Sequence, residues 1–182
     1  MTLLRNIGLE FLRRVQAGEY VNLLLCGKPG VGKTFLALSI LKEVSKMRIE
    51  YPEYNVHGYE HGIYRTSDRL CEELKIASGY GAKVNKYDLI DRYARAKVFV
   101  LDEIGRTNQK NERDALFAVL DRRYQEGKSN ILITNYTTEK LSECLGDALN
   151  NRINENAIFL NPKVIEKCPS MRDARIKGQL RG

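Results

Sequence analysis

The segment GKPGVGKT at residues 27–34 constrains this chain more than any other feature. It fits the pattern G-x4-G-K-[ST] in full, follows an apolar run at residues 21–26 and precedes a helical pattern. The three glycines let the backbone wrap closely around a polyphosphate, so that successive N–H groups and the start of the helix face it. A glycine loop between a buried strand and a helix predicts a P-loop, and therefore a parallel α/β sheet.

Two side chains at the end of this loop have distinct expected roles. Lys33 supplies a mobile positive charge for the terminal phosphates, and Thr34 supplies a hydroxyl for Mg²⁺. ATP and Mg²⁺ are therefore the expected cofactors. The residues expected to bind the nucleotide are Gly27, Lys28, Pro29, Gly30, Val31, Gly32, Lys33 and Thr34.

A second apolar run, at residues 98–101, ends in two acids, Asp102 and Glu103. A carboxylate at the tip of a buried strand is costly unless a cation or a donor compensates it. Mg²⁺ held through water would compensate Asp102, which with Thr34 forms the expected metal site. Glu103 is then expected to orient or deprotonate the attacking water.

A third apolar run, ending at residue 133, is followed by Thr134 and Asn135. Parallel sheets bind ligands at the carboxyl ends of their strands, so both side chains are expected beside the phosphates. Asn135 is expected to hydrogen-bond the attacking water or the terminal phosphate. The alternative is an asparagine that only stabilises the following turn.

Strand-like runs alternate with helical patterns along the whole chain. We expect a three-layer α/β P-loop domain with a mainly parallel five-stranded sheet and little or no lid domain. Residues 1–20 are expected to form a short helix and linker, and residues 21–182 the ATPase domain. Ser67 is expected to cap the helix that it begins. The predicted strands cover residues 21–26, 63–66, 98–101, 129–134 and 158–160, and the predicted helices start near residues 3, 33, 67, 87, 112, 138 and 147.

Composition excludes several classes of protein. A chain of 182 residues with 43% hydrophobic and 29% charged residues is typical of one soluble globular domain. Its apolar runs are too short to span a bilayer, and residues 1–12 do not form a signal peptide, so we expect a cytoplasmic protein with no membrane partner. The net charge of +7 permits a nucleic-acid partner, and residues 161–182 hold six basic and two acidic residues.

Two other chemistries receive little support. The four cysteines are scattered, with no C-x-x-C pair, which argues against a disulfide or zinc framework. His57, Glu60 and His61 match H-x-x-E-H, but Pro52, Gly58 and Gly62 predict a loop where a zinc peptidase needs a helix.

Taken together, these segments resemble the AAA+ ATPases of the bacterial and phage replicative helicase loaders (DnaC- and DnaI-like) and their relatives, the IstB-like transposition ATPases. The resemblance covers nearly the whole chain. Its specific part is the combination of the P-loop and the acidic strand with D-R-R-Y before the third strand and T-N-Y after it. The segments are NLLLCGKPGVGKTFLA (22–37), YRTSDRLCEEL (64–74), VFVLDEIG (98–105), LFAVLDRRYQEGKSNILITNY (116–136), LNNRI (149–153) and PSMRDARIK (169–177).

The resemblance implies further roles and partners. Asn135 is similar to the first sensor residue of the family, and Arg152 to the arginine finger that reaches a neighbouring subunit's ATP. Arg172 is similar to the second sensor, although Met171 replaces the family's aromatic residue. The implied partners are a hexameric replicative helicase, single-stranded DNA, and further copies of this chain in an ATP-bridged oligomer. The helix from Ser67 is implied to face DNA, with Lys75, Lys83 and Lys86 as candidate phosphate contacts.

The sequence leaves the function open between several classes. A helicase-loader ATPase in DNA replication is the leading interpretation. A transposition ATPase that coats duplex DNA, a nucleotide-gated binding module without turnover and a small-molecule kinase are the alternatives. Loaders of this group carry an amino-terminal region that grips the helicase, and only about 20 residues precede the first strand here. The chain is therefore expected to be either an excised ATPase domain or a compact phage-type loader.

Overall fold

The structure is a computed structural model that describes residues 2–46, 61–106 and 109–160. Five strands form one sheet in the order β2-β3-β4-β1-β5, and every neighbouring pair is parallel. The strands are β1 (Asn22–Leu25), β2 (Gly62–Thr66), β3 (Val98–Ile104), β4 (Ser129–Thr134) and β5 (Ala157–Leu160). The predicted parallel five-stranded sheet is confirmed, and the carboxyl ends of its strands share one edge.

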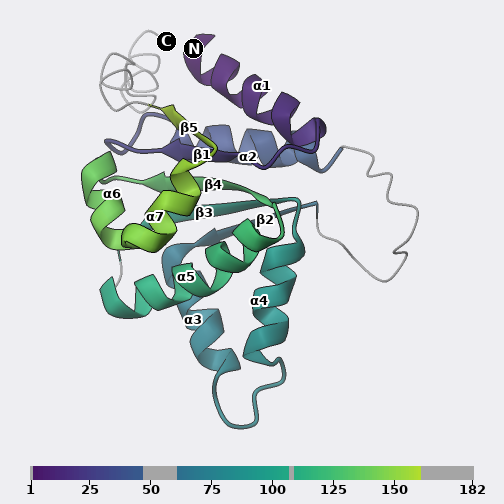
Figure 1. The fold of residues 1–182 in the computed structure, drawn as a ribbon, viewed down its shortest axis with the longest axis vertical. Coiled ribbons are helices and arrows are strands. Elements are labelled where there is room, and N and C mark those ends of the chain that lie inside the picture. The colour runs from purple at the N-terminus through teal and green to yellow at the C-terminus, as the bar shows by residue number, and fades with distance from the viewer. Residues whose placement is uncertain (1, 47–60, 107–108, 161–182) are drawn as a thin grey trace, which may run out of the picture.

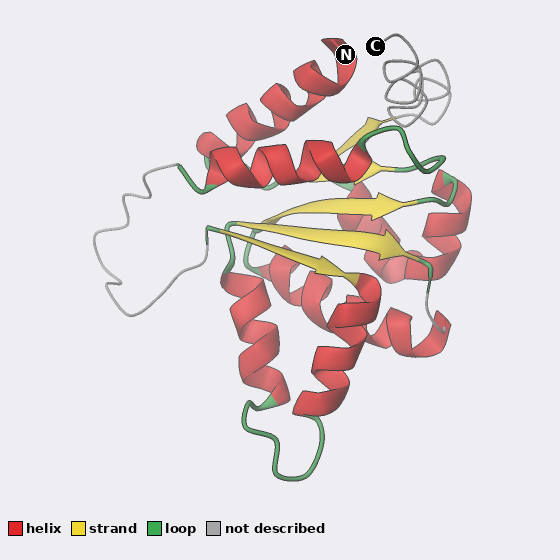
Figure 2. Cartoon of the chain, turned by 180° about the vertical axis from the view of Figure 1, so that it is seen from behind, coloured by secondary structure: helices red, strands yellow, loops and turns green. Residues whose placement is uncertain are grey.

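Helices cover both faces of this sheet (Figures 1 and 2). On one face lie α1 (Thr2–Gln16) and α2 (Lys33–Val44), and on the other lie α3 (Ser67–Ala77), α4 (Lys86–Arg95), α5 (Gln109–Gln125), α6 (Thr138–Leu145) and α7 (Asp147–Asn154). Because both faces are covered, the central strands are apolar on both sides, and two separate clusters of buried side chains form the three-layer core.

The amino-terminal helix α1 is part of this packing. Phe11 and Val15 are buried in the cluster that α2 and the sheet share. Gly8 lies close to α2, since a Cβ there would stand 3.0 Å from the side chain of Leu36. Within the described part of the chain, no helix is long and apolar enough to cross a membrane.

Most predicted elements agree with the structure to within a few residues, with two informative differences. The helix α3 is capped by Thr66, whose hydroxyl accepts a hydrogen bond from the amide of Arg69 at 3.3 Å, and not by Ser67. Ser67 is the first helical residue, and its hydroxyl points into the core. The strand β3 also continues through Asp102 to Ile104, because hydrogen bonds compensate the buried carboxylate.

The opposite edge of the sheet, at the amino ends of the strands, holds a buried polar network around Arg123. This guanidinium is fully buried and donates to Asn130 Oδ1 and to four backbone carbonyl groups. Three of these carbonyls lie at the end of α4, and the fourth belongs to the first residue of β4. Burial lowers the pKa of Arg123 to about 9, so the side chain is still charged at neutral pH. The network continues from Asn130 to Asn22, and from Asn22 to the carbonyl of Ile153 at the end of α7.

Candidate functional site

The P-loop lies directly after β1, as predicted. Gly27, Gly30 and Gly32 have φ angles of 119°, 87° and 93°, a region that side chains with a Cβ rarely adopt. Gly32 precedes the first residue of α2. The glycines therefore give the loop the shape by which backbone amides and a helix start can surround a phosphate group.

The ammonium group of Lys33 lies inside this loop. Only 6% of the residue is exposed. Its Nζ donates hydrogen bonds to the carbonyl oxygens of Gly27 and Lys28, at 2.6 and 2.8 Å, and to Oδ1 of Asn135 at 3.1 Å. Burial lowers the pKa of Lys33, and the nearby charge of Asp102 opposes that shift. Lys33 thus links the end of β1 to the end of β4, the juxtaposition expected from the strand ends.

Asp102 is the buried carboxylate next to this lysine, with 4% of the residue exposed. Its Oδ2 accepts hydrogen bonds from Thr34 Oγ1 at 2.7 Å and from the Tyr64 hydroxyl at 3.0 Å, and its Oδ1 accepts one from the Glu103 amide. Burial raises the pKa of Tyr64 to about 12, and Asp102 adds to that shift. A carboxylate beside a hydroxyl is the oxygen donor set that suits Mg²⁺, so Thr34 and Asp102 fit the expected metal.

Glu103 lies next to Asp102 in a strained backbone conformation. Its φ of 60° is the only positive φ of a non-glycine residue in the described ranges. Such strain costs about 1–3 kcal/mol and is typical of functional sites. The carboxylate is part exposed and accepts a hydrogen bond from Arg106 at 2.6 Å. Glu103 therefore combines solvent access with a carboxylate position that the backbone fixes.

The two polar residues at the end of β4, Thr134 and Asn135, have different partners. Asn135 contacts Lys33, as expected for a residue at the phosphate edge. Thr134 instead bonds backbone groups of its neighbours. Its buried hydroxyl donates to the carbonyl of Ile104 at 2.8 Å and accepts from the Tyr136 amide. The hydroxyl fixes the ends of β3 and β4 to one another.

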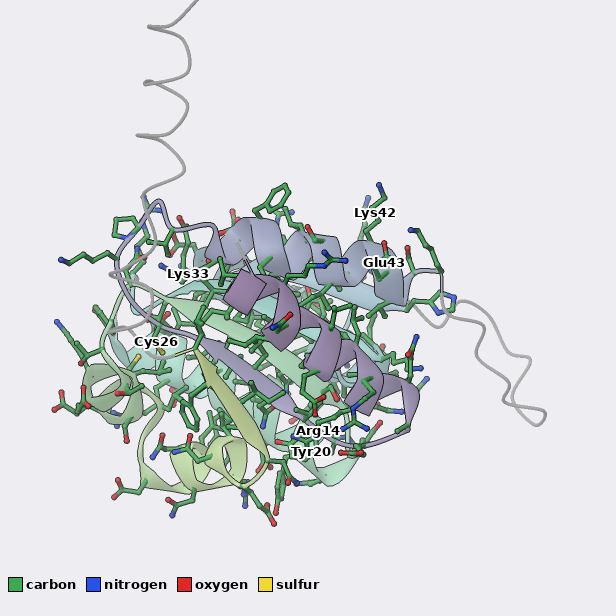
Figure 3. All side chains as sticks on the ribbon, turned by 90° about the horizontal axis from the view of Figure 1, so that it is seen from above. Arg14, Tyr20, Cys26, Lys33, Lys42 and Glu43 are labelled. Carbon is green, nitrogen blue, oxygen red and sulfur yellow. The ribbon has the colours of Figure 1, made fainter. Side chains whose placement is uncertain are left out.

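Arg152 lies near the amino ends of the strands, at the opposite end of the sheet from the P-loop. It is in the last turn of α7, where the Tyr20 hydroxyl contacts its backbone carbonyl at 3.3 Å. Tyr20 precedes β1 and Cys26 follows it, and Figure 3 shows these two residues at opposite ends of the strand, with Lys33 near Cys26. The guanidinium forms an ion pair with Asp121 and lies over the rings of Phe117 and Tyr124. Arg152 is thus distant from the P-loop of its own chain.

Some predicted features fall outside the described residues. These are Arg172 and the rest of the basic segment after residue 160, and also His57 and Glu60. In the ranges that the structure describes, no group of three or more His, Cys, Asp or Glu side chains could hold a metal ion. Cys26 and Cys144 are buried thiols.

Sequence reasoning missed three residues around the site. Tyr64 bonds Asp102 because β2 pairs with β3, and Arg106 bonds Glu103. Glu112 is fully buried, and its carboxylate accepts a hydrogen bond from the amide of Gly105, two residues after Glu103. A signal for Glu112 was present, since an acid at a buried position of a helix is unusual, but its partners depend on the strand order.

Comparison with known proteins agrees with this geometry. Residues 7–173 match the family model of the IstB-like ATP binding protein. The chain is 29% identical over 148 residues to an insertion sequence IS5376 putative ATP-binding protein of Geobacillus stearothermophilus, covering 78% of this chain and 53% of that protein. It is 24% identical over 137 residues to the replicative helicase loader DnaC of Escherichia coli, covering 75% and 51%.

Solved structures give the same fold. A crystal structure of the DnaC helicase loader superposes with a TM-score of 0.64 at 25% identity, covering 87% of this chain and 90% of that one. The chain thus has the fold of the AAA+ P-loop ATPases. The chain spans about half the length of the curated relatives that it matches. What those whole proteins do is therefore not carried over by similarity alone.

Proposed function

The chain belongs to the IstB-like family of ATP-binding proteins, with the AAA+ fold of DnaC, and from that premise we propose that it hydrolyses ATP with Mg²⁺. The observation that supports turnover is the convergence of three strand ends. Lys33 and Thr34 follow β1, Asp102 and Glu103 end β3, and Asn135 follows β4. These residues supply positive charge, metal-binding oxygens and a carboxylate within one small region.

Each of these residues has a role that suits its contacts. Lys33 exchanges its bonds to loop carbonyls for bonds to the terminal phosphates. Thr34 and Asp102 hold Mg²⁺, which neutralises charge on the phosphates when it is bound. Asn135, already bonded to Lys33, orients the terminal phosphate or the attacking water. Glu103 accepts the proton of that water or orients it.

Arg152 is proposed to complete the site of a neighbouring copy. A residue at the amino edge of the sheet cannot reach the P-loop of its own chain at the carboxyl edge. In a head-to-tail assembly, the same residue faces the neighbour's phosphates and stabilises the charge of the transition state, a contribution of about 10³-fold or more in related enzymes. The bonds from Tyr20 and Asn22 to the end of α7 hold the helix segment that carries Arg152.

Mixing two variants tests hydrolysis and assembly together. Lys33→Ala retains the arginine but loses the pocket, and Arg152→Ala retains the pocket but loses the arginine. We expect each variant alone to release phosphate at a small fraction of the wild-type rate, and the mixture to regain activity at hybrid interfaces. Full activity of Arg152→Ala alone refutes the role of Arg152. Absence of phosphate release by the wild type at any concentration favours the nucleotide-gated module without turnover.

We further propose that the chain acts in DNA replication as a helicase loader, binding single-stranded DNA and a hexameric replicative helicase. The tip of the hairpin formed by α3 and α4 projects far from the sheet (Figure 1). It exposes large apolar side chains next to basic ones, a combination that stacks bases and contacts phosphates of single strands. The exposed apolar residues are Ile76, Tyr80, Val84 and Tyr87, and the exposed lysines are Lys75, Lys83 and Lys86.

DNA binding distinguishes the loader from the transposition ATPase. We expect fluorescence anisotropy with ATP to give tighter binding to single-stranded than to duplex DNA. Tyr80→Ala is expected to weaken single-strand binding by about tenfold, the scale of one lost stacking contact. A pull-down with a replicative helicase, with and without ATP, tests the second partner. Preference for duplex DNA without helicase binding favours the transposition role.

A further inference from the structure

Glu112 is a buried carboxylate that the proposed hydrolysis does not use. It lies in the first turn of α5 with none of its surface exposed. Its Oε1 accepts hydrogen bonds from the Ser67 hydroxyl and from the Gly105 amide, the latter at 2.8 Å. Its Oε2 is buried and has no hydrogen-bond partner within the described part of the chain. Among the described residues no lysine or arginine bonds this carboxylate, and its two donors there are Ser67 and Gly105.

The carbonyl group of Gly105 is also bonded by a side chain. The Tyr136 hydroxyl donates to the Gly105 carbonyl at 2.5 Å, and Thr134 donates to the carbonyl of the preceding residue, Ile104. Gly105 has a φ of 92°, and a Cβ there would lie 2.1 Å from the Tyr136 ring. We call Glu112, Tyr136 and Gly105 the Gly105 clamp. Both backbone polar groups of Gly105 are thus bonded by side chains from two other elements.

The clamp acts two residues after Glu103. The φ of 60° at Glu103 costs free energy, and such a conformation persists only when its surroundings fix it. Thr134 and the clamp fix Ile104 and Gly105, so the chain after Glu103 cannot rotate back to a relaxed conformation. Ser67 is the first residue of α3, so the same carboxylate also joins this segment to the α3–α4 hairpin.

We propose that Glu112 is a positioning residue that sets the place of the Glu103 carboxylate by holding Gly105. This inference rests on the proposed hydrolysis, in which Glu103 acts on the attacking water. A carboxylate buried with so few donors costs desolvation free energy that an apolar residue would avoid. In return, Glu112 fixes the amide of Gly105. The fixed amide in turn sets the direction in which the Glu103 side chain leaves the backbone.

The test compares Glu112→Ala with Glu112→Gln in the full chain. Alanine removes both bonds, whereas glutamine keeps an oxygen that accepts from Ser67 and Gly105. We expect alanine to lower single-turnover ATP hydrolysis by about tenfold or more, because a displacement of about 1 Å costs up to about 10²-fold. The Kd for ATP is expected to stay within about twofold, since Lys33 and Thr34 are untouched, and glutamine is expected to restore most of the rate. Asp114→Ala removes an exposed carboxylate from the same helix and is the matched control, with every readout unchanged.

A second readout separates positioning from simple loss of stability. Hydrogen exchange of the Gly105 amide reports the bond directly, and we expect it to accelerate in Glu112→Ala while exchange of the β4 amides stays slow. If Glu112→Ala does not fold, Ser67→Ala and Tyr136→Phe each remove one hydroxyl group and are expected to slow hydrolysis by about threefold. Wild-type rates in the folded Glu112→Ala variant, or in both hydroxyl variants, overturn the inference. A wild-type chain without hydrolysis refutes the proposed function instead, and the exchange of Gly105 then still tests the clamp.

Discussion

Replacing Arg123 by methionine should lower the stability of the fold more than any other single change to an arginine in the described ranges. The guanidinium makes five hydrogen bonds in a fully buried place, at 2.5 Å to Asn130 Oδ1 and between 2.6 and 3.2 Å to four carbonyl oxygens. At about 1 kcal/mol net for each bond, their loss amounts to about 5 kcal/mol. Methionine avoids the desolvation of a charge, which offsets part of this loss, so we expect a net decrease of about 3–5 kcal/mol.

The neighbouring arginine provides the control. Arg122 has a side chain that is 47% exposed and pairs with Asp91 and Glu126 at 3.4 and 3.2 Å. Exposed pairs of this kind contribute at most about 1 kcal/mol, so Arg122→Met should have a small effect. Arg123→Lys should fall between the two, since an ammonium has three donors for the five acceptors.

Urea unfolding measures these differences directly, and thermal unfolding checks them. For a domain of this size each kcal/mol corresponds to about 2–4 °C, so Arg123→Met should lower Tm by about 6–20 °C. A decrease of less than about 1 kcal/mol, or equal effects of the two methionine variants, would refute the reasoning that the buried bonds at Arg123 hold the amino edge of the sheet together.

Three further predictions concern the site. Lys33→Ala should abolish measurable ATP affinity by titration calorimetry, because it removes the buried charge next to the phosphates, and near wild-type binding would show that the P-loop assignment is wrong. Glu103→Gln should bind ATP normally but lower steady-state phosphate release by at least about 10²-fold, the usual scale for loss of a general base, and unchanged release would move that role to another residue. Cys26 is 1% exposed and burial raises its pKa to about 11, so it stays a neutral thiol up to about pH 10. Iodoacetamide at pH 8 should therefore modify the part-exposed Cys71 before Cys26 in the folded protein, as peptide mass spectrometry would show, and equal rates would contradict the buried position.

The sequence predicted the parts of the site that follow from motif and strand order. Asp102 and Asn135 closely follow apolar runs, and Lys33 ends the glycine loop that follows another. In a parallel sheet the carboxyl ends of such strands meet at one edge. Their convergence therefore needed only the identification of three strands. Tyr64 could not be found in this way. A single sequence does not show that β2 lies next to β3, and it is this pairing that brings the Tyr64 hydroxyl to Asp102.

The errors have similar causes. Thr66 and Ser67 are adjacent hydroxyl residues, and either could cap α3 until the backbone of Thr66 is known to be extended. The apolar pattern of β3 ends at Leu101 and predicts a strand that stops there. Donors from Thr34 and Tyr64 compensate the buried carboxylate of Asp102, so the strand continues through it. Local patterns do not contain these tertiary contacts, which decide the outcome.

The order of strands has a consequence for how the chain folds as it is synthesised. The strand β1 lies between β4 and β5, and Asn22 pairs with Asn130 and with Ala157. A ribosome therefore makes the P-loop before the neighbours of its strand, which follow more than a hundred residues later. Contacts this distant in sequence form slowly. Until β4 emerges, the apolar residues of β1 have no partner in the sheet and are exposed to aggregation or to chaperones. The strand that leads into the P-loop is thus made well before its partners, and the nucleotide site is assembled only after β4 and β5 have been made.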